Sequence, residues 1–192
     1  MLDEQLHFML DERLHWKEHI DTICNKVNKR LGILARIRSR LTLKAANCVY
    51  NTLIEPVLCY TNTVWGESSA TSSKTLQRLQ NRAACIVLRR DSSKDTFNVL
   101  GWAELETKRK RHKCTLVFKC LNNLVPIYLS DYFTRNCNVH SYNTRRRTDL
   151  HLRKPKLSLA KQTLRYSGSV LFNLFTSLYS KSRVTFFLQS IN

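Results

Sequence analysis

The sequence predicts a mainly α-helical protein: a helical bundle with a short N-terminal strand and a basic, loop-rich C-terminal part. Three observations lead to this class. Apolar residues recur at helical spacing over most of residues 16–124. Only 4 glycines and 3 prolines occur among 192 residues, which excludes fibrous repeats. Hydrophobic residues make up 43% of the chain, enough to build the core of one sizeable domain or two small ones.

The first predicted elements are a strand and a long helix. Leu6, Phe8 and Leu10 alternate along residues 6–11, as on one face of a strand. From Trp16 the apolar spacing becomes helical and continues to Leu41. Arginines gather at the end of this segment, where cations favour the helix dipole.

The next segments predict two more helices. Thr42 suits the N-cap of a helix that reaches Tyr60, with a kink at Pro56 because proline has no backbone donor. The Ser/Thr-rich residues 68–73 predict a loop, and the apolar positions from Leu76 to Val87 predict a third helix.

The second half begins with a fourth long helix, which carries apolar residues from Leu105 to Leu124 and is closed by Pro126. Residues 134–163 are polar and basic and predict an extended loop with one strand near 150–157. Two short helices are expected over 166–178 and 184–188. The expected division is into residues 1–15, the helical region 16–130, and the basic extension 131–192.

The charge predicts a polyanionic partner. Lysine and arginine number 32 against 14 acidic residues, a net charge of +18 and a pI near 10.0. Residues 1–21 hold six acids and two bases, a net −4, so the remainder carries +22. RNA and DNA, bound without sequence preference, are the expected partners, and no small-molecule substrate is expected.

The cysteines and the hydropathy favour a nuclear or cytoplasmic protein that is not secreted. Seven scattered cysteines form no CxxC pair, and no signal peptide is recognisable. No apolar run approaches the roughly 20 residues that a membrane helix needs, so no membrane association is expected.

Several motifs, read in order, resemble the region that follows the polymerase core in LINE-type (non-LTR, jockey-like) retrotransposon reverse transcriptases. The most specific stretch resembles the family's Y-x-x-L-I-x-P-x-L-x-Y-x-x-x-V-W-G run. The matching residues, from the N-terminus onward, are Leu6, Phe8, Leu10, Asp11, Leu14, Trp16, His19, Ile20, Leu31, Gly32, Tyr50, Leu53, Ile54, Pro56, Leu58, Tyr60, Val64, Trp65, Gly66, Leu76, Leu79, Gln80, Arg82, Ala83, Leu100, Trp102, Leu105, Asn122, Pro126, Tyr128, Leu129, Thr144, Arg145, Gly168 and Asn173.

The resemblance implies a thumb-like bundle from which the catalytic palm is missing. Residues 1–15 would be the remnant of the last palm strand, and the missing polymerase core would be a possible partner. Palm aspartates hold two magnesium ions in this family, whereas this chain has no adjacent Asp pair. We therefore expect no polymerisation by this chain alone and no cofactor. An inert relic of a decayed transposable element is the alternative.

Basic residues are the candidate nucleic-acid contacts. The run from Lys108 to Lys113 can be a solvated helix face, a nuclear-localisation patch or a stripe that contacts phosphates. The triplet at 145–147 can contact phosphates or form a disordered basic loop. The candidate residues are Lys108, Arg109, Lys110, Arg111, Lys113, Arg78, Arg82, Arg145, Arg146 and Arg147.

Other motifs favour structural roles. The string from His15 to His19 matches an H-x-x-E-H zinc-protease signature, but no third ligand is identifiable, and a packing His19 is the better interpretation. The three tryptophans could stack on bases, yet their apolar, periodic settings favour core packing. Cys114 and Cys120 fit no zinc-ligand spacing.

Overall fold

The computed structural model describes residues 16–66, 69–90 and 95–178. This part is 71% helix and contains no strand, which confirms the mainly α class. The strand expected at 6–11 and the helix expected at 184–188 lie outside the described residues. None of the described helices is both long enough and apolar enough to cross a membrane.

The chain divides into two compact units, Met1–Arg109 (unit 1) and Lys110–Asn192 (unit 2). The division falls inside helix α7 (Leu105–Leu121), twenty-one residues before the expected boundary at 130/131. The sequence offers no signal there, because the helix continues through it.

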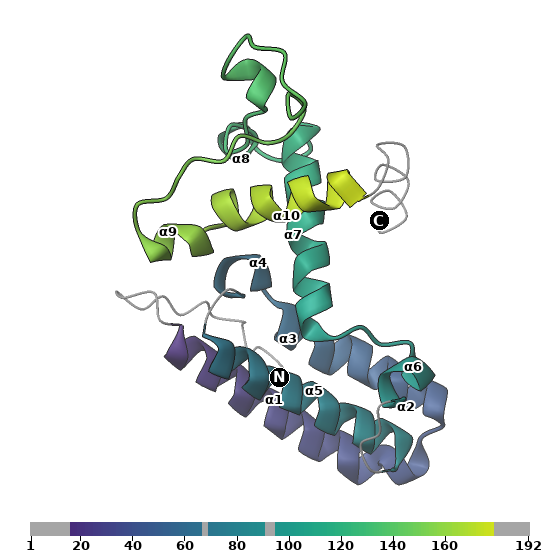
Figure 1. Cartoon of the computed structure of the whole chain (residues 1–192). Coiled ribbons are helices and arrows are strands. Elements are labelled where there is room, and N and C mark those ends of the chain that lie inside the picture. Colours follow the sequence, from purple (N-terminus) through teal and green to yellow (C-terminus); the bar gives the residue numbers. More distant parts are fainter. Residues whose placement is uncertain (1–15, 67–68, 91–94, 179–192) are drawn as a thin grey trace. The chain divides into compact units, whose positions relative to one another are not determined.

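The main helices of unit 1 form a bundle of three. Helices α1 and α5 lie side by side, and both contact a third, interrupted helix (Figure 1). Their bounds are α1 Lys17–Ile37 with η1 Arg38–Arg40; the interrupted helix α2 Leu43–Val49, η2 Tyr50–Ile54 and α3 Glu55–Cys59; α5 Ala70–Leu88; and the short α4 Asn62–Trp65 and α6 Thr96–Leu100.

The helix ends follow local chemistry. The Thr42 side chain accepts a hydrogen bond from the Ala45 amide (3.2 Å), as predicted for an N-cap. The kink at Pro56 stays a prediction. Just before Pro56 the structure has a π-helical turn, in which the Glu55 amide donates to the Tyr50 carbonyl five residues earlier. Gly101 ends α6 with φ +67°, a left-handed conformation that glycine adopts without strain.

The loop predicted over 68–73 is wrong for most of its length. Ser69 caps α5 instead, and its hydroxyl accepts from the Ser72 amide at 3.2 Å. Residues 70–73 are therefore the first turn of the helix. Serine and threonine are weak helix formers in a helix interior, but a serine at the N-cap satisfies an amide that would otherwise lack a partner.

Core packing of the tryptophans is confirmed. Trp65 is fully buried and Trp16 is 8% exposed. Trp102 stacks on the buried Tyr50 with a 3.6 Å separation between ring centroids, and its indole N–H donates to Asn47 Oδ1 (2.7 Å). The Tyr50 hydroxyl accepts from Gln80 Nε2 (3.2 Å), which ties α5 to the interrupted helix.

His19 gives unit 1 a pH dependence. Its ring is 3% exposed and lies edge-on to Trp65, with 5.8 Å between the centroids. Burial, reinforced by the positive charge of Lys26, lowers the pKa of His19 below 6.5. The unfolded chain therefore binds a proton near pH 6.5 that the folded chain does not, and stability is lost as the pH falls through that value.

We expect the free energy of unfolding of unit 1 to decrease between pH 7 and pH 5. All three tryptophans lie in unit 1, so urea unfolding followed by tryptophan fluorescence measures it. His19→Phe should remove the part of this decrease that His19 causes. An identical pH profile for the variant would contradict the assignment.

Unit 2 is built on the second part of α7 and on α10 (Leu164–Leu178), which contact each other (Figure 1). A Cβ on Gly168 would lie 3.0 Å from Val117 Cγ2, so glycine permits this close approach. The remaining elements are α8 Ile127–Ser130, η3 Asn136–Asn138 and α9 Ser158–Gln162. The buried core of unit 2 consists of Cys114, Val117, Cys120, Phe133, Leu150 and Phe172.

One amide side chain anchors the long loop of unit 2 to α10. Asn173 Oδ1 accepts from the Leu150 amide (2.8 Å), and its Nδ2 donates to the Leu150 carbonyl (2.9 Å). The strand expected near 150–157 is wrong: in this described segment only Leu150 forms a β-bridge, with Arg135. The backbone amide and carbonyl of Leu150 form hydrogen bonds with the Asn173 side chain, where a strand would bond a neighbouring strand.

Candidate nucleic-acid interface

The basic run of α7 does not form a single charged face. Arg109 and Lys113 are four residues apart and therefore share one side of the helix. They are 8% and 2% exposed, whereas Lys110 and Arg111 are exposed. The run therefore presents only part of its charge to solvent.

The inward-facing cations have internal partners. The Arg109 guanidinium donates to the Gly66 carbonyl (3.2 Å) and to Ser73 Oγ (2.8 Å), and it lies over the Trp65 ring at 5.7 Å. Lys108 forms an ion pair with Glu55. In unit 2, Lys113 Nζ donates to Ser167 Oγ (3.2 Å).

These internal partners affect which of the predicted cations can contact a phosphate. Arg109 and Lys113 are held within their units, and their burial argues against a direct phosphate contact because a phosphate could not reach them without local opening. Lys110 and Arg111 remain accessible and keep the predicted role.

Arg78 and Arg82 are exposed on α5 in unit 1. The Arg82 guanidinium donates to Asn28 Oδ1 (3.2 Å) on α1. This neutral partner leaves the positive charge available to an anion, so both side chains remain candidates.

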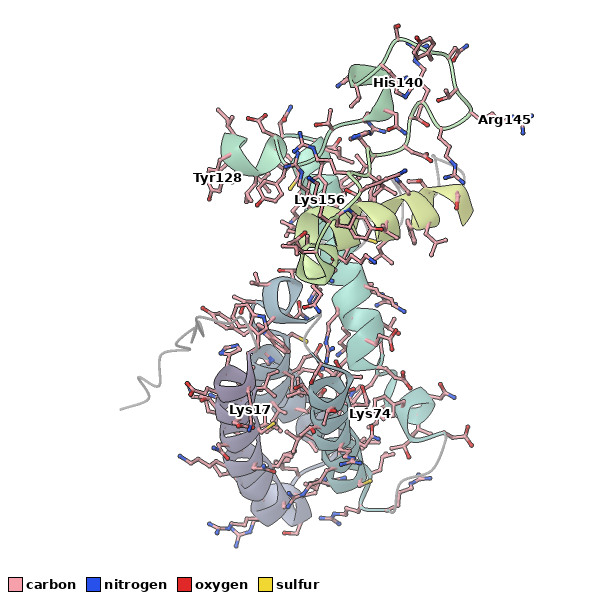
Figure 2. All side chains as sticks on the ribbon, turned by 60° about the vertical axis from the view of Figure 1, so that its left-hand side comes forward. Lys17, Lys74, Tyr128, His140, Arg145 and Lys156 are labelled. Carbon is pink, nitrogen blue, oxygen red and sulfur yellow. The ribbon has the colours of Figure 1, made fainter. Side chains whose placement is uncertain are left out.

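The triplet Arg145, Arg146 and Arg147 lies on a turn that is held by hydrogen bonds. The Cys137 amide donates to the Arg147 carbonyl (3.0 Å), and Asn136 Nδ2 donates to the Arg146 carbonyl (2.8 Å). The three side chains are exposed. Figure 2 shows Arg145 at the outer edge of this loop, pointing away from the rest of unit 2. The backbone thus fixes the turn while the three charges face solvent.

The positive charge is concentrated in unit 2. Its 83 residues hold 15 lysines and arginines against two aspartates, a net +13. Unit 1 holds 17 against 12 acidic residues, a net +5. A polyanion should therefore be attracted most strongly to unit 2.

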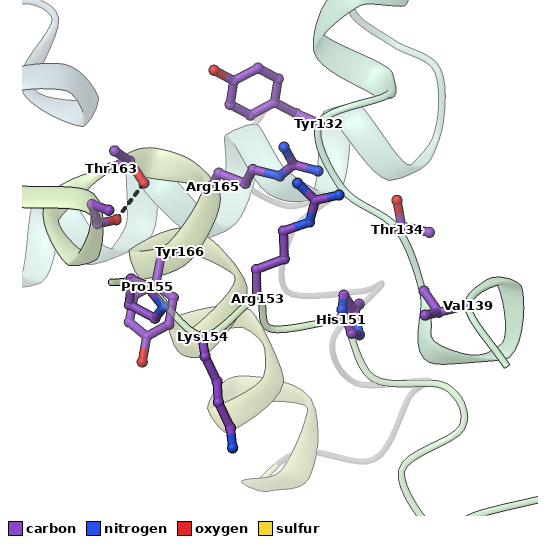
Figure 3. A pocket seen from close by; sticks show the side chains of 11 residues that line it. Tyr132, Thr134, Val139, His151, Arg153, Lys154, Pro155, Thr163, Arg165 and Tyr166 are labelled. Carbon is purple, nitrogen blue, oxygen red and sulfur yellow. Dashed lines mark hydrogen bonds between the residues drawn. The ribbon is translucent and has the colours of Figure 1, made fainter. Parts of the chain in front are cut away.

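Unit 2 also holds a basic and aromatic pocket that was not predicted from the sequence. The cavity has a volume of about 380 Å³. Figure 3 shows Arg153 and Arg165 pointing toward one another beside Tyr132. These residues come from separate segments, so no local sequence pattern brings them together.

No metal centre emerges in the part of the chain that the structure describes, where no three His, Cys, Asp or Glu side chains converge. His15 lies outside the described residues, and His19 packs among the tryptophans. Burial raises the pKa of Cys59 and of Cys114 to about 11, so both thiols stay protonated at neutral pH.

Comparisons with known proteins give no match: no family model, no curated protein and no solved structure is similar to this chain.

Proposed function

We propose that this chain binds RNA and DNA through their phosphates, without sequence preference and without catalysis of its own. The observation that carries the proposal is the net charge of +13 in unit 2, where exposed arginines stand on a hydrogen-bonded turn and only two acidic residues oppose them. Phosphate contacts by lysine and arginine supply affinity without reading bases.

The proposal also concerns the protein from which this chain derives. The chain would be the thumb and downstream connector of a non-LTR retrotransposon reverse transcriptase, which grips template and primer while a separate palm performs synthesis. Supporting it, residues of the resemblance share the core of unit 1: Tyr50, Trp65 and Leu76 are fully buried, and Gln80 bonds Tyr50. These four residues of the resemblance therefore lie in the core of unit 1.

The turn variant Arg145→Ala/Arg146→Ala/Arg147→Ala tests the interface. We expect its affinity for a single-stranded oligonucleotide to fall roughly 100-fold at 0.1 M salt, because each lost contact removes about 0.7 from the slope of log K against log salt. Fluorescence anisotropy with a labelled 20-mer measures the affinity.

The matched control removes three exposed cations from α1: Lys17→Ala/Lys29→Ala/Arg36→Ala. It should weaken binding much less, since unit 1 carries little net charge. Equal losses for the two variants would show that binding is diffuse and would remove the turn from the interface.

A further inference from the structure

The basic and aromatic pocket of unit 2 gathers cations without an acidic residue to balance them. It lies between the 151–155 segment, residues 132–134 and the start of α10 (Figure 3). Its lining contains Arg153, Lys154 and Arg165, together with His151. None of its lining residues is an aspartate or a glutamate.

Two of these cations converge. Figure 3 shows the Arg153 side chain extending toward the Arg165 guanidinium, whereas Lys154 points to another side. Both arginines are exposed at the cavity wall. Like charges repel one another, so an anion bound between the two guanidinium groups would stabilise this arrangement. A phosphate can accept two parallel hydrogen bonds from a guanidinium.

An aromatic ring adjoins this anion site. Tyr132 is 45% exposed, and the Arg165 guanidinium lies over its ring at 5.6 Å from the centroid. Half-buried Tyr166 and Pro155 complete the wall. An exposed aromatic ring beside an arginine pair provides partners for both parts of a nucleotide, the base and the phosphate.

The volume limits the occupant. About 380 Å³ lies at the lower end of small-ligand sites, which run from about 300 to 1,000 Å³. It can accept one nucleotide and cannot enclose a base pair. In a duplex the bases are paired and stacked, so only a single strand can direct a base toward Tyr132.

We propose that this pocket binds one nucleotide of a single-stranded nucleic acid, with its phosphate between Arg153 and Arg165 and its base against Tyr132. This inference rests on the proposed function and adds to it a preference for single strands. The preference arises because duplex DNA can use the exposed cations but not the pocket.

The experiment compares binding of a labelled single-stranded 10-mer and of the matching duplex to the full chain. Tyr132→Leu should lower affinity for the single strand about tenfold, in line with the loss of one stacked base, and leave duplex affinity unchanged. Tyr132→Phe keeps the ring and should bind as the unaltered chain does. If Tyr132→Phe loses as much as Tyr132→Leu, stacking is excluded.

A second pair of variants tests the charges of the pocket. Arg153→Gln/Arg165→Gln removes the two converging cations, and Lys156→Gln/Lys161→Gln is the matched control. The control lysines are exposed and do not line the pocket. The arginine variant should lose at least fivefold more affinity for the single strand than the control, while both lose equally on duplex. If the arginine variant and the control lose equal affinity on the single strand as well as on the duplex, the proposed nucleotide pocket is wrong, while nonspecific phosphate binding by the chain still stands.

Competition with adenosine monophosphate tests whether the pocket binds a nucleotide within a strand or a free nucleotide. It should displace the 10-mer only at concentrations far above that of an unlabelled 10-mer. Displacement at equal concentration would overturn the strand assignment in favour of a free nucleotide. If the unaltered chain binds neither single strand nor duplex at low salt, the proposed function itself fails.

Discussion

Tyr50→Ala is expected to destabilise unit 1 by about 3–5 kcal/mol, the usual range for removing a large buried aromatic side chain. The Tyr50 ring is fully buried, stacks on Trp102 and accepts a hydrogen bond from Gln80. Its loss leaves a cavity at the point where α5 and the interrupted helix meet. Because domains are stable by only about 5–15 kcal/mol, this loss is a large fraction of the free energy of unfolding of unit 1.

Urea unfolding followed by tryptophan fluorescence measures this effect in unit 1 alone. Tyr50→Phe is the control, because it keeps the ring and loses only the hydroxyl, at an expected cost of about 1 kcal/mol. Gln80 Nε2 retains its second acceptor, the Ala103 carbonyl at 3.0 Å. A Tyr50→Ala variant as stable as Tyr50→Phe would contradict the packing described for this core.

The helices of unit 1 could be predicted because their signals are local. Apolar spacing located α1, α5 and the interrupted helix, and Thr42 marked a true N-cap. The start of α5 could not be predicted in the same way. A Ser/Thr-rich segment suggests a loop, but here its Ser69 caps the helix and the residues after it form the first helical turn.

The candidate interface was harder to predict than the fold. A run of charges in the sequence does not show which of them face inward, and in α7 the helical period turns Arg109 and Lys113 toward internal partners. The pocket at Tyr132 is lined by residues separated by up to 34 positions in the sequence. Such convergence requires the tertiary structure.

The affinity of the unaltered chain for nucleic acid is expected to depend steeply on salt. Binding through phosphates releases counterions, and each contact on a single strand contributes about −0.7 to the slope of log K against log salt. About six contacts give a slope near −4, so raising the salt from 50 to 200 mM should weaken binding roughly 250-fold. The exposed cations of unit 2 are sufficient for this number, since Lys110, Arg111, the 145–147 triplet and Arg153 already make six.

The salt titration of the unaltered chain is therefore the most direct measurement of its central property. Anisotropy of a labelled single-stranded 20-mer, recorded from 50 to 300 mM salt with two unrelated base sequences, should give slopes near −4 and affinities that agree within a few-fold. A slope near zero would contradict phosphate binding, a strong difference between the two sequences would contradict nonspecific recognition, and no binding even at 50 mM would leave the inert relic as the account of this chain.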